Sequence, residues 1–321
     1  MAILGNEQFR YEVSGDNWGE LPKGWFYKEA TAVDVDSKDN VYVFNRGNHP
    51  MIVFDSQGNV LRSWGQGLFT NPHAVTIAPD DTVWCVDNVD NSIRRFTPDG
   101  KLLFTLTEKD PSPEMSGKPF NRPTRVAIDP RNGEILVADG YGNARVHRFS
   151  ADGKRLLASW GESGTDPGHF NIVHDIAIDK SGWIYIADRE NRRIQVFSPD
   201  GKYEAQWVNF SRTAAVHISK GHEQLVYVGE YFAADPEVCS IAMRLGPRVS
   251  ILDTNGRLLA RLGEHPCGGE PGRFYAPHAV ATDSRGDIYV AEVSYSERFD
   301  KQKEPTKELR SMQKLIKSSD G

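Results

Sequence analysis

Residues 71–75 read Asn-Pro-His-Ala-Val, and this short motif returns further along the chain. It recurs at 172–176 as Ile-Val-His-Asp-Ile and at 276–280 as Ala-Pro-His-Ala-Val, with about 100 residues between successive copies. Copies of the same form without histidine lie between them, at 31–33, 124–126 and 214–216. The chain therefore contains six copies of one unit. When the six copies are aligned, the second, fourth and sixth carry a histidine at the same position. These residues are His73, His174 and His278.

Each copy begins a run of four short β-type segments. In the second repeat, residues 83–87 are Val-Trp-Cys-Val-Asp, and a further apolar run follows at 93–96. An Asp-Gly pair at 99–100 then supplies the positive φ angles of a tight hairpin turn before the last segment. Four antiparallel strands at a mean period of about 49 residues are typical of a propeller blade. The sequence therefore predicts an all-β fold, a six-bladed β-propeller with four antiparallel strands in each blade.

The two ends of the chain suggest how the propeller closes. Residues 9–13 alternate between apolar and polar side chains, and we expect this N-terminal strand to pair into the last blade and cover its open edge. The propeller is predicted over residues 1–303 and a charged tail over 304–321. Apolar residues 309, 312, 315 and 316 are at helical spacing, so the tail could form a short surface helix or could equally be frayed. The fifth repeat carries an additional segment at 231–247.

Composition narrows the classes of function. The 321 residues are 39% hydrophobic and 26% charged, as in an ordinary globular protein. A net charge of −6 gives no sign of a positively charged surface that would bind nucleic acid. No run of apolar residues approaches the roughly 20 that a membrane-spanning helix requires. The first residues lack a basic region followed by an apolar one, and the three cysteines include no Cys-x-x-Cys pair. We expect a cytoplasmic protein that binds neither nucleic acid nor membranes.

The alternating histidines predict a metal site. The first strand of each blade lines the central channel of a propeller, and alternate blades of six lie about 120° apart. His73, His174 and His278 would then form a three-nitrogen site with open positions, as in catalytic zinc sites. Imidazole also suits iron, copper and nickel, so another divalent transition metal could replace zinc. The alternative is three channel histidines that bond only to water and backbone.

The repeats resemble NHL repeats, and residues 40–292 resemble the peptidyl-α-hydroxyglycine α-amidating lyases. The matching segments are residues 46–49, 72–73, 139–145, 173–174, 187–195 and 277–278. The resemblance implies a six-bladed propeller with zinc on the three histidines. It also implies a tyrosine that acts as base and an arginine near the substrate, for which the matching residues are Tyr141, Arg46 and Arg189.

The sequence departs from that family at several places, and two of these departures concern a bound cation and disulfides. The family has an aspartate after its last histidine that helps to hold a structural calcium ion, and here this residue is Ala279. Because a hard cation prefers oxygen ligands, we expect calcium to be absent or weakly bound. Gly142 and Val196 stand where secreted animal members have cysteines.

The family reaction cleaves the C–N bond of R-CO-NH-CH(OH)-COO⁻ to give an amide and glyoxylate. Zinc would act as a Lewis acid, and Tyr141 would remove the hydroxyl proton. A free tyrosine has a pKa near 10, so a neighbouring cation is needed to favour the phenolate. Arg46 or Arg189 could supply that charge or bind the carboxylate bidentately. We also expect Gly140 and Gly142 to adopt positive φ angles that project the ring. The alternatives are an aromatic at the channel mouth and arginines paired with neighbouring acids.

The sequence therefore favours a metal-dependent lyase that acts on a small or peptide-derived carboxylated hemiaminal, a group that ureidoglycolate-like compounds share. A metal-dependent hydrolase such as a lactonase is the second hypothesis, and a carboxylate in place of one histidine would favour it. A non-catalytic NHL-repeat scaffold is the third. It predicts no tightly bound metal and a binding patch on one face.

Overall fold

The computed structural model describes residues 2–14, 18–107, 110–232, 245–263, 266–297 and 308–318. Within these ranges the regular secondary structure consists of strands, arranged in six sheets. The chain divides into two compact units. Unit 1 comprises Met1–Gln66 and His217–Gly321, and unit 2 comprises Gly67–Val216. The boundary at Val216 falls within strand β19 (Arg212–Ile218).

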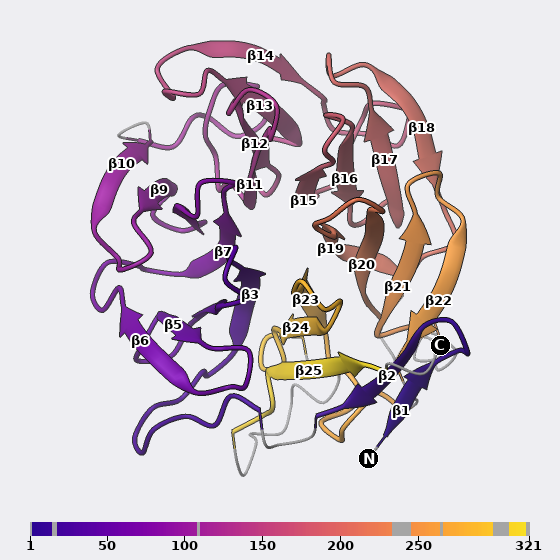
Figure 1. Ribbon diagram of the computed structural model, residues 1–321. Coiled ribbons are helices and arrows are strands. Elements are labelled where there is room, and N and C mark those ends of the chain that lie inside the picture. The colour runs from indigo at the N-terminus through magenta and orange to yellow at the C-terminus, as the bar shows by residue number, and fades with distance from the viewer. Residues whose placement is uncertain are drawn as a thin grey trace. The chain divides into compact units, whose positions relative to one another are not determined.

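Unit 2 contains three four-stranded antiparallel sheets, one for each of the second, third and fourth repeats (Figure 1). Strands that follow one another in the chain are neighbours in each sheet. The strands are β7 (Pro72–Ile77), β8 (Val83–Asp87), β9 (Ser92–Phe96), β10 (Leu102–Leu106), β11 (Arg125–Ile128), β12 (Ile135–Asp139), β13 (Arg145–Phe149), β14 (Leu156–Trp160), β15 (Val173–Ile178), β16 (Ile184–Asp188), β17 (Arg193–Phe197) and β18 (Tyr203–Trp207).

Unit 1 holds the sheets of the first, fifth and sixth repeats. Their strands are β3 (Ala30–Val35), β4 (Val41–Asn45), β5 (Met51–Phe54), β6 (Val60–Trp64), then β19 with β20 (Leu225–Tyr231), β21 (Arg248–Asp253) and β22 (Leu258–Leu262), and finally β23 (Pro277–Thr282), β24 (Ile288–Glu292), β25 (Met312–Lys317), β2 (Arg10–Val13) and β1 (Ile3–Gly5). These six blades confirm the predicted all-β propeller class. Most of the additional segment at 231–247, residues 233–244, lies outside the described residues.

The last sheet confirms that the N-terminal strand pairs into the sixth blade. Its order is β1-β2-β25-β24-β23, so two N-terminal strands complete it (Figure 1). Tyr11 lies opposite Lys317 and Val13 opposite Leu315 in the β2–β25 ladder. The sheet therefore has five strands, and β1 rather than β2 forms its edge.

The prediction of a surface helix in the C-terminal tail is wrong for Met312–Lys317, which form β25. Met312 and Leu315 are buried at helical spacing because this strand is covered on both faces. Buried Gln313 donates to the Glu292 carboxylate (3.3 Å), and the buried Lys314 ammonium lies 2.9 Å from Asp287. Pairing with β24 and β2 therefore overrides the local pattern, as tertiary context commonly does.

Burial differs systematically between inner and outer strands. The second strands of the unit 2 sheets, β8, β12 and β16, are buried at every residue, which explains their continuous apolar runs. The fourth strands, β10, β14 and β18, are largely exposed. Apolar clusters join the second repeat's sheet to the third and the third to the fourth. Each blade of unit 2 is thus stabilised mainly by packing against the next.

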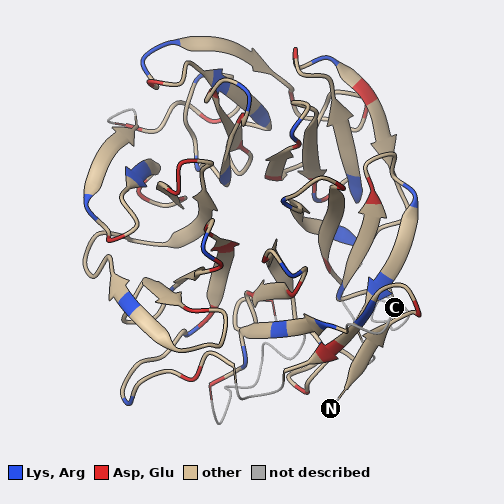
Figure 2. Ribbon diagram, in the orientation of Figure 1, with Lys and Arg blue, Asp and Glu red and all other residues tan. Residues whose placement is uncertain are grey.

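The turns and the charges agree with the sequence pattern. The glycines of the predicted hairpin turns have positive φ, from 69° at Gly153 to 94° at Gly58. Basic and acidic residues are interspersed along the strands and loops of each unit (Figure 2). Among the described residues, no helix has the length and apolar character that a membrane crossing requires.

Candidate functional site

The three repeated histidines occupy the same place in three different sheets. Each is the second residue of the first strand of its sheet, in β7, β15 and β23. The pairing register with the second strand shifts across each of them, between Pro72 and Ala74, Val173 and Asp175, and Pro277 and Ala279. A shift of this kind is a β-bulge, which re-aims the side chain of the additional residue. The backbone therefore presents all three imidazoles in one manner.

One hydrogen-bond pattern fixes the orientation of each imidazole. His73 Nδ1 lies 2.7 Å from the carbonyl oxygen of Thr124, His174 Nδ1 lies 2.6 Å from that of Ala214, and His278 Nδ1 lies 2.6 Å from that of Thr31. A carbonyl oxygen can only accept, so Nδ1 carries the proton and Nε2 carries the lone pair of a neutral ring.

The three accepting carbonyls explain why histidine occurs in alternate repeats. Thr31, Thr124 and Ala214 stand at the histidine register of the repeats that lack histidine. Each histidine thus bonds to the backbone of the next repeat in the cycle. All three histidines are buried, at 2%, 2% and 6% exposure for His73, His174 and His278. Metal-binding histidines are usually held by such a carbonyl, so each of these histidines presents Nε2 as an atom that could bind a metal ion.

Within unit 2, the phenol of Tyr141 joins two of these histidines. Its oxygen lies 3.1 Å from His73 Nε2 and 3.1 Å from His174 Nε2. The two imidazole centroids are 5.2 Å apart. The phenol has a single proton and can donate to only one nitrogen at a time, so two lone pairs converge on one oxygen. This is a donor arrangement that suits a cation or an acidic proton.

Two guanidinium groups lie beside the ring of Tyr141. The Cζ atoms of Arg122 and Arg189 are 5.2 Å and 5.7 Å from the ring centroid, within cation–π distance. Arg189 also pairs with Glu190 (2.8 Å), and Glu190 pairs with Arg212 (2.8 Å). Burial alone would raise the pKa of Glu190, but hydrogen bonds and positive charge from these two arginines outweigh burial and hold that pKa below its usual value. The ion pair foreseen for Arg189 is present.

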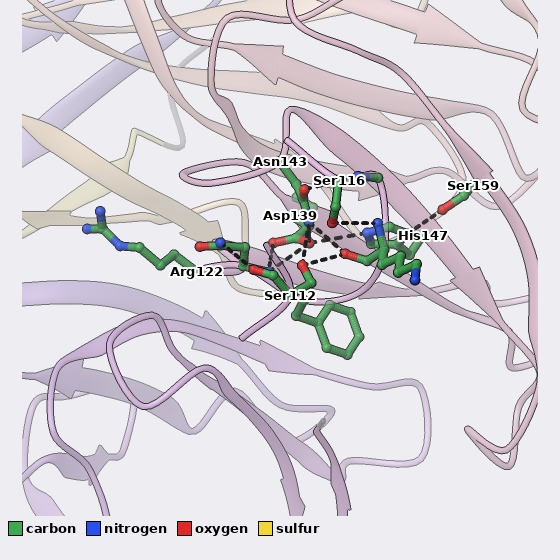
Figure 3. Close-up of polar contacts among 12 residues, drawn as sticks. Ser112, Ser116, Arg122, Asp139, Asn143, His147 and Ser159 are labelled. Atoms are coloured by element: carbon green, nitrogen blue, oxygen red, sulfur yellow. Dashed lines mark hydrogen bonds and ion pairs between the residues drawn. The ribbon is translucent and has the colours of Figure 1, made fainter. Parts of the chain in front are cut away.

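A buried network holds the loop that carries Tyr141 (Figure 3). Asp139 ends β12 and accepts hydrogen bonds from the Asn121 backbone N–H (2.9 Å) and the Asn143 side chain (2.7 Å). His147 Nε2 lies 3.2 Å from the same carboxylate, and its Nδ1 contacts the Ser159 hydroxyl. Asp139 is therefore a cap of the strand end, and His147 supports it from β13.

The two glycines beside Tyr141 act through close packing, and the prediction of positive φ angles is wrong for both. Neither Gly140 nor Gly142 has φ in the left-handed region. A Cβ at Gly140 would lie 1.8 Å from the carbonyl oxygen of Val173, next to His174, and one at Gly142 would lie 2.2 Å from Asn121 Oδ1. Only glycine allows the loop to approach this closely.

In unit 1, Arg46 is held by Glu29. Arg46 Nη1 lies 2.6 Å from the Glu29 carboxylate, which also accepts from the Ser296 backbone N–H and hydroxyl. His49, three residues later, stacks on Trp25 with ring centroids 3.6 Å apart. Arg46, like Arg189, therefore forms the ion pair with a neighbouring acid that the sequence analysis gave as the alternative to substrate binding. Ala279, which follows His278 in this unit, is buried.

Comparison with known proteins places the chain among NHL-repeat proteins. Residues 120–149 and 170–197 match the NHL repeat family. NHL repeat-containing protein 3 of Mus musculus is 31% identical over 320 residues, which cover 90% of this chain and 86% of the mouse protein. The chain belongs to the family of NHL repeat-containing protein 3. The Tyr141 loop and His174 both fall within the matched repeats.

This NHL-repeat protein is also similar to amidating enzymes. Peptidyl-glycine alpha-amidating monooxygenase of Mus musculus is 27% identical over 330 residues, covering 90% of this chain and 32% of the mouse enzyme. Peptidyl-alpha-hydroxyglycine alpha-amidating lyase 1 of Drosophila melanogaster is 33% identical over 217 residues, covering 56% of this chain and 39% of the fly protein. The chain thus spans 32% or 33% of the length of three amidating monooxygenases that it matches and 21% of the length of a fourth.

Two features of the site were not foreseen from the sequence. One is Arg122, which precedes the Thr124 register by two residues and carries no motif. The other is the set of carbonyl partners for the histidines. Both depend on segments that are distant in the chain, so no local pattern could have revealed them.

Proposed function

We propose that this protein is a metal-dependent lyase that cleaves the C–N bond of a carboxylated hemiaminal, R-CO-NH-CH(OH)-COO⁻, to an amide and glyoxylate. The observation that carries the proposal is the single phenol oxygen of Tyr141 at 3.1 Å from two histidine Nε2 atoms. The similarity to a protein named peptidyl-alpha-hydroxyglycine alpha-amidating lyase supports the same class of reaction.

We propose that His73, His174 and His278 jointly bind one zinc ion or another divalent transition metal. The common Nδ1-to-carbonyl bond supports this, because it leaves Nε2 of each ring as the donor atom. When bound, such an ion would polarise and acidify the substrate hydroxyl as a Lewis acid. Ala279 supports the further expectation that no tight structural calcium site accompanies it.

The residues of the chain would supply the proton transfer and the orientation. Tyr141 would take the hydroxyl proton as the general base, and the guanidinium groups of Arg122 and Arg189 lie beside its ring. The hydroxyl oxygen then forms the C=O bond of glyoxylate while the C–N bond breaks. The nitrogen keeps the electron pair of that bond and takes a proton to become the amide. Arg46 and Arg189 would hold the substrate carboxylate. The acyl group R could be small or peptide-derived.

Metal analysis combined with turnover tests the proposal. Protein purified without chelators should contain about one transition-metal ion per chain. It should also release glyoxylate from an N-acyl-α-hydroxyglycine. His174→Ala should lose the metal and the activity, because one of three ligands is removed. His169→Ala is the matched control, since His169 lies in the same unit and pairs with Glu162 at 2.9 Å.

Three outcomes would contradict the proposal. They are an absence of transition metal, retention of metal by His174→Ala, and a metal-loaded protein that releases no glyoxylate. A protein that contains no transition metal and releases no glyoxylate would favour a non-catalytic binding scaffold. Release of a carboxylic acid in place of an amide would favour a hydrolase.

A further inference from the structure

Unit 1 contains a cavity beside the loop that precedes β3. Its volume is 540 Å³. Sites for small molecules usually measure about 300–1,000 Å³, so this cavity is large enough for a ligand. Three segments of unit 1 supply its wall, within residues 18–27, 269–275 and 308–312. None of the candidate site residues lines it, so the cavity is a separate feature of the molecule.

Four aromatic residues line this cavity, and two of the rings are held in place by contacts of their own. Trp18 Nε1 donates to the carbonyl oxygen of Ser56 (3.1 Å), and Trp25 stacks on His49 with ring centroids 3.6 Å apart. Rings that are fixed before a ligand arrives lower the entropic cost of binding it. Aromatic faces attract organic cations, and methylene chains pack along such apolar surfaces. The four residues are Trp18, Trp25, Tyr27 and Tyr275.

The charged residues of the cavity wall are two carboxylates and one guanidinium. Glu308 accepts the backbone N–H of Tyr27 (2.7 Å), and no described lysine or arginine forms an ion pair with Glu308 or Glu270. The guanidinium of Arg310 donates to the carbonyl oxygen of Glu270 (2.6 Å), and its charge opposes the burial that raises the pKa of Glu292. The wall therefore carries a net negative charge, and both carboxylates can still bind a cation.

A buried hydroxyl belongs to the same wall. Ser311 is 1% exposed, and its Oγ makes no hydrogen bond with the described residues. A buried hydroxyl without a partner costs free energy, and rotation about one bond is enough to redirect it. An N–H group bound in the cavity would give it a partner. Aromatic faces, carboxylates and a hydroxyl that can accept are together suited to an ammonium group.

We propose that this cavity binds an aliphatic diamine or polyamine. The methylene chain lies along the aromatic rings, and the ammonium groups bind the carboxylates of Glu270 and Glu308. Ser311 accepts one of the ammonium N–H groups. This inference concerns a second site and does not depend on the proposed lyase function.

Calorimetry with three probes of the same chain length tests the charge of the ligand. Cadaverine (1,5-diaminopentane) has two ammonium groups, n-pentylamine has one, and 1,5-pentanediol has none. In about 0.15 M salt, which screens weak attraction to an acidic protein, cadaverine should bind at one site per chain. n-Pentylamine should bind about 5- to 10-fold more weakly, and pentanediol more weakly still, because each step removes a charged hydrogen bond. Absence of cadaverine binding, or equal affinity for cadaverine and either of the other probes, would overturn the proposal.

Three variants locate the binding site. Glu270→Gln and Glu308→Gln keep the size of the side chain and remove its charge, so each should weaken cadaverine binding by about 5- to 10-fold. Ser311→Ala should weaken it by about 2- to 5-fold, the effect of one hydrogen bond to a neutral group. Native affinity in both glutamine variants would contradict the assigned site.

Glu223→Gln is the matched control. Glu223 is an exposed carboxylate of the same unit that does not line the cavity, so this variant should bind cadaverine like the native protein. An equal loss of affinity in Glu223→Gln would overturn the proposal, because cadaverine would then be attracted by the acidic surface in general. Circular dichroism should be the same for all variants. The readout is binding, so the result is independent of whether the protein releases glyoxylate.

Discussion

The loop that carries Tyr141 in unit 2 and the loop that carries Arg46 in unit 1 are built alike but balanced differently. Each follows the second strand of its sheet, after a capping residue, Asp139 in one case and Asn45 in the other. Each loop also contains a glycine at which an added Cβ would lie 1.8 Å from a backbone carbonyl oxygen. The glycine is Gly140, against Val173, in unit 2 and Gly47, against Phe26, in unit 1.

The difference lies in the charges. In unit 1 the guanidinium of Arg46 is matched by the almost fully buried carboxylate of Glu29. In unit 2 the loop presents the phenol of Tyr141, and the guanidinium groups of Arg122 and Arg189 lie beside its ring. The same strand-end architecture thus holds a buried ion pair in one unit and a phenol flanked by guanidinium groups in the other.

The largest expected effect comes from removing the one hydroxyl that distinguishes the unit 2 loop. Tyr141→Phe should lower kcat on an N-acyl-α-hydroxyglycine by about 10²- to 10⁴-fold, because a positioned acid–base group is lost. Metal content and fold should be retained. Steady-state kinetics and elemental analysis check both.

Tyr203→Phe is the control for that variant, since Tyr203 lies in β18 of the same unit and its ring packs against Phe197. It should have nearly native kinetics. A Tyr141→Phe enzyme with native kcat and a raised KM would show that Tyr141 is a wall of the pocket rather than the base.

A smaller effect is expected from adding a methyl group to each loop. Gly140→Ala and Gly47→Ala should each lower the free energy of unfolding by about 1–3 kcal/mol, because both would press on a backbone carbonyl. Their kinetics should differ. Gly140→Ala moves the phenol and should reduce kcat, whereas Gly47→Ala moves Arg46 and should raise KM. Each variant is the control for the other, and identical kinetic changes would contradict separate roles for the two loops.

The smallest effect concerns the strand-end carboxylates. Glu292 ends β24 in unit 1, and burial raises its pKa to about 7, although the charge of Arg310 and the N–H of Tyr275 oppose this. The folded protein therefore binds a proton that the unfolded chain has already released. Stability should fall as the pH rises from about 5 to 7, by at most about 1.4 kcal/mol per pH unit, and then level off.

Glu292→Gln should remove that dependence. Its free energy of unfolding relative to the native protein should rise between pH 5 and 7 and stay constant above, as measured by urea unfolding at each pH. Glu12→Gln, at an exposed position of β2 in the same sheet, is the control. A constant difference across this range would show that Glu292 is ionised throughout.

The sequence predicted the fold well because the information is local and repeated. Continuous apolar runs such as those of β8 and β16, and the Asp-Gly turns, recur in the repeats, so their agreement identified strands and period. The prediction failed at β25. That strand has no hairpin partner nearby in sequence and is defined by β24 and by β2 from the other end of the chain.

The candidate site divides in the same way. The sequence by itself determined that His73, His174 and His278 share one register and that Tyr141 follows a strand end, because both are properties of the repeat. Only the tertiary structure decided which nitrogen each histidine presents, since the carbonyls of Thr31, Thr124 and Ala214 belong to other strands. It also decided that Arg122 faces the phenol, because that contact depends on a left-handed backbone held by Asn91. Hydrogen bonds between distant segments have no local signal, so they appear only once the chain has folded.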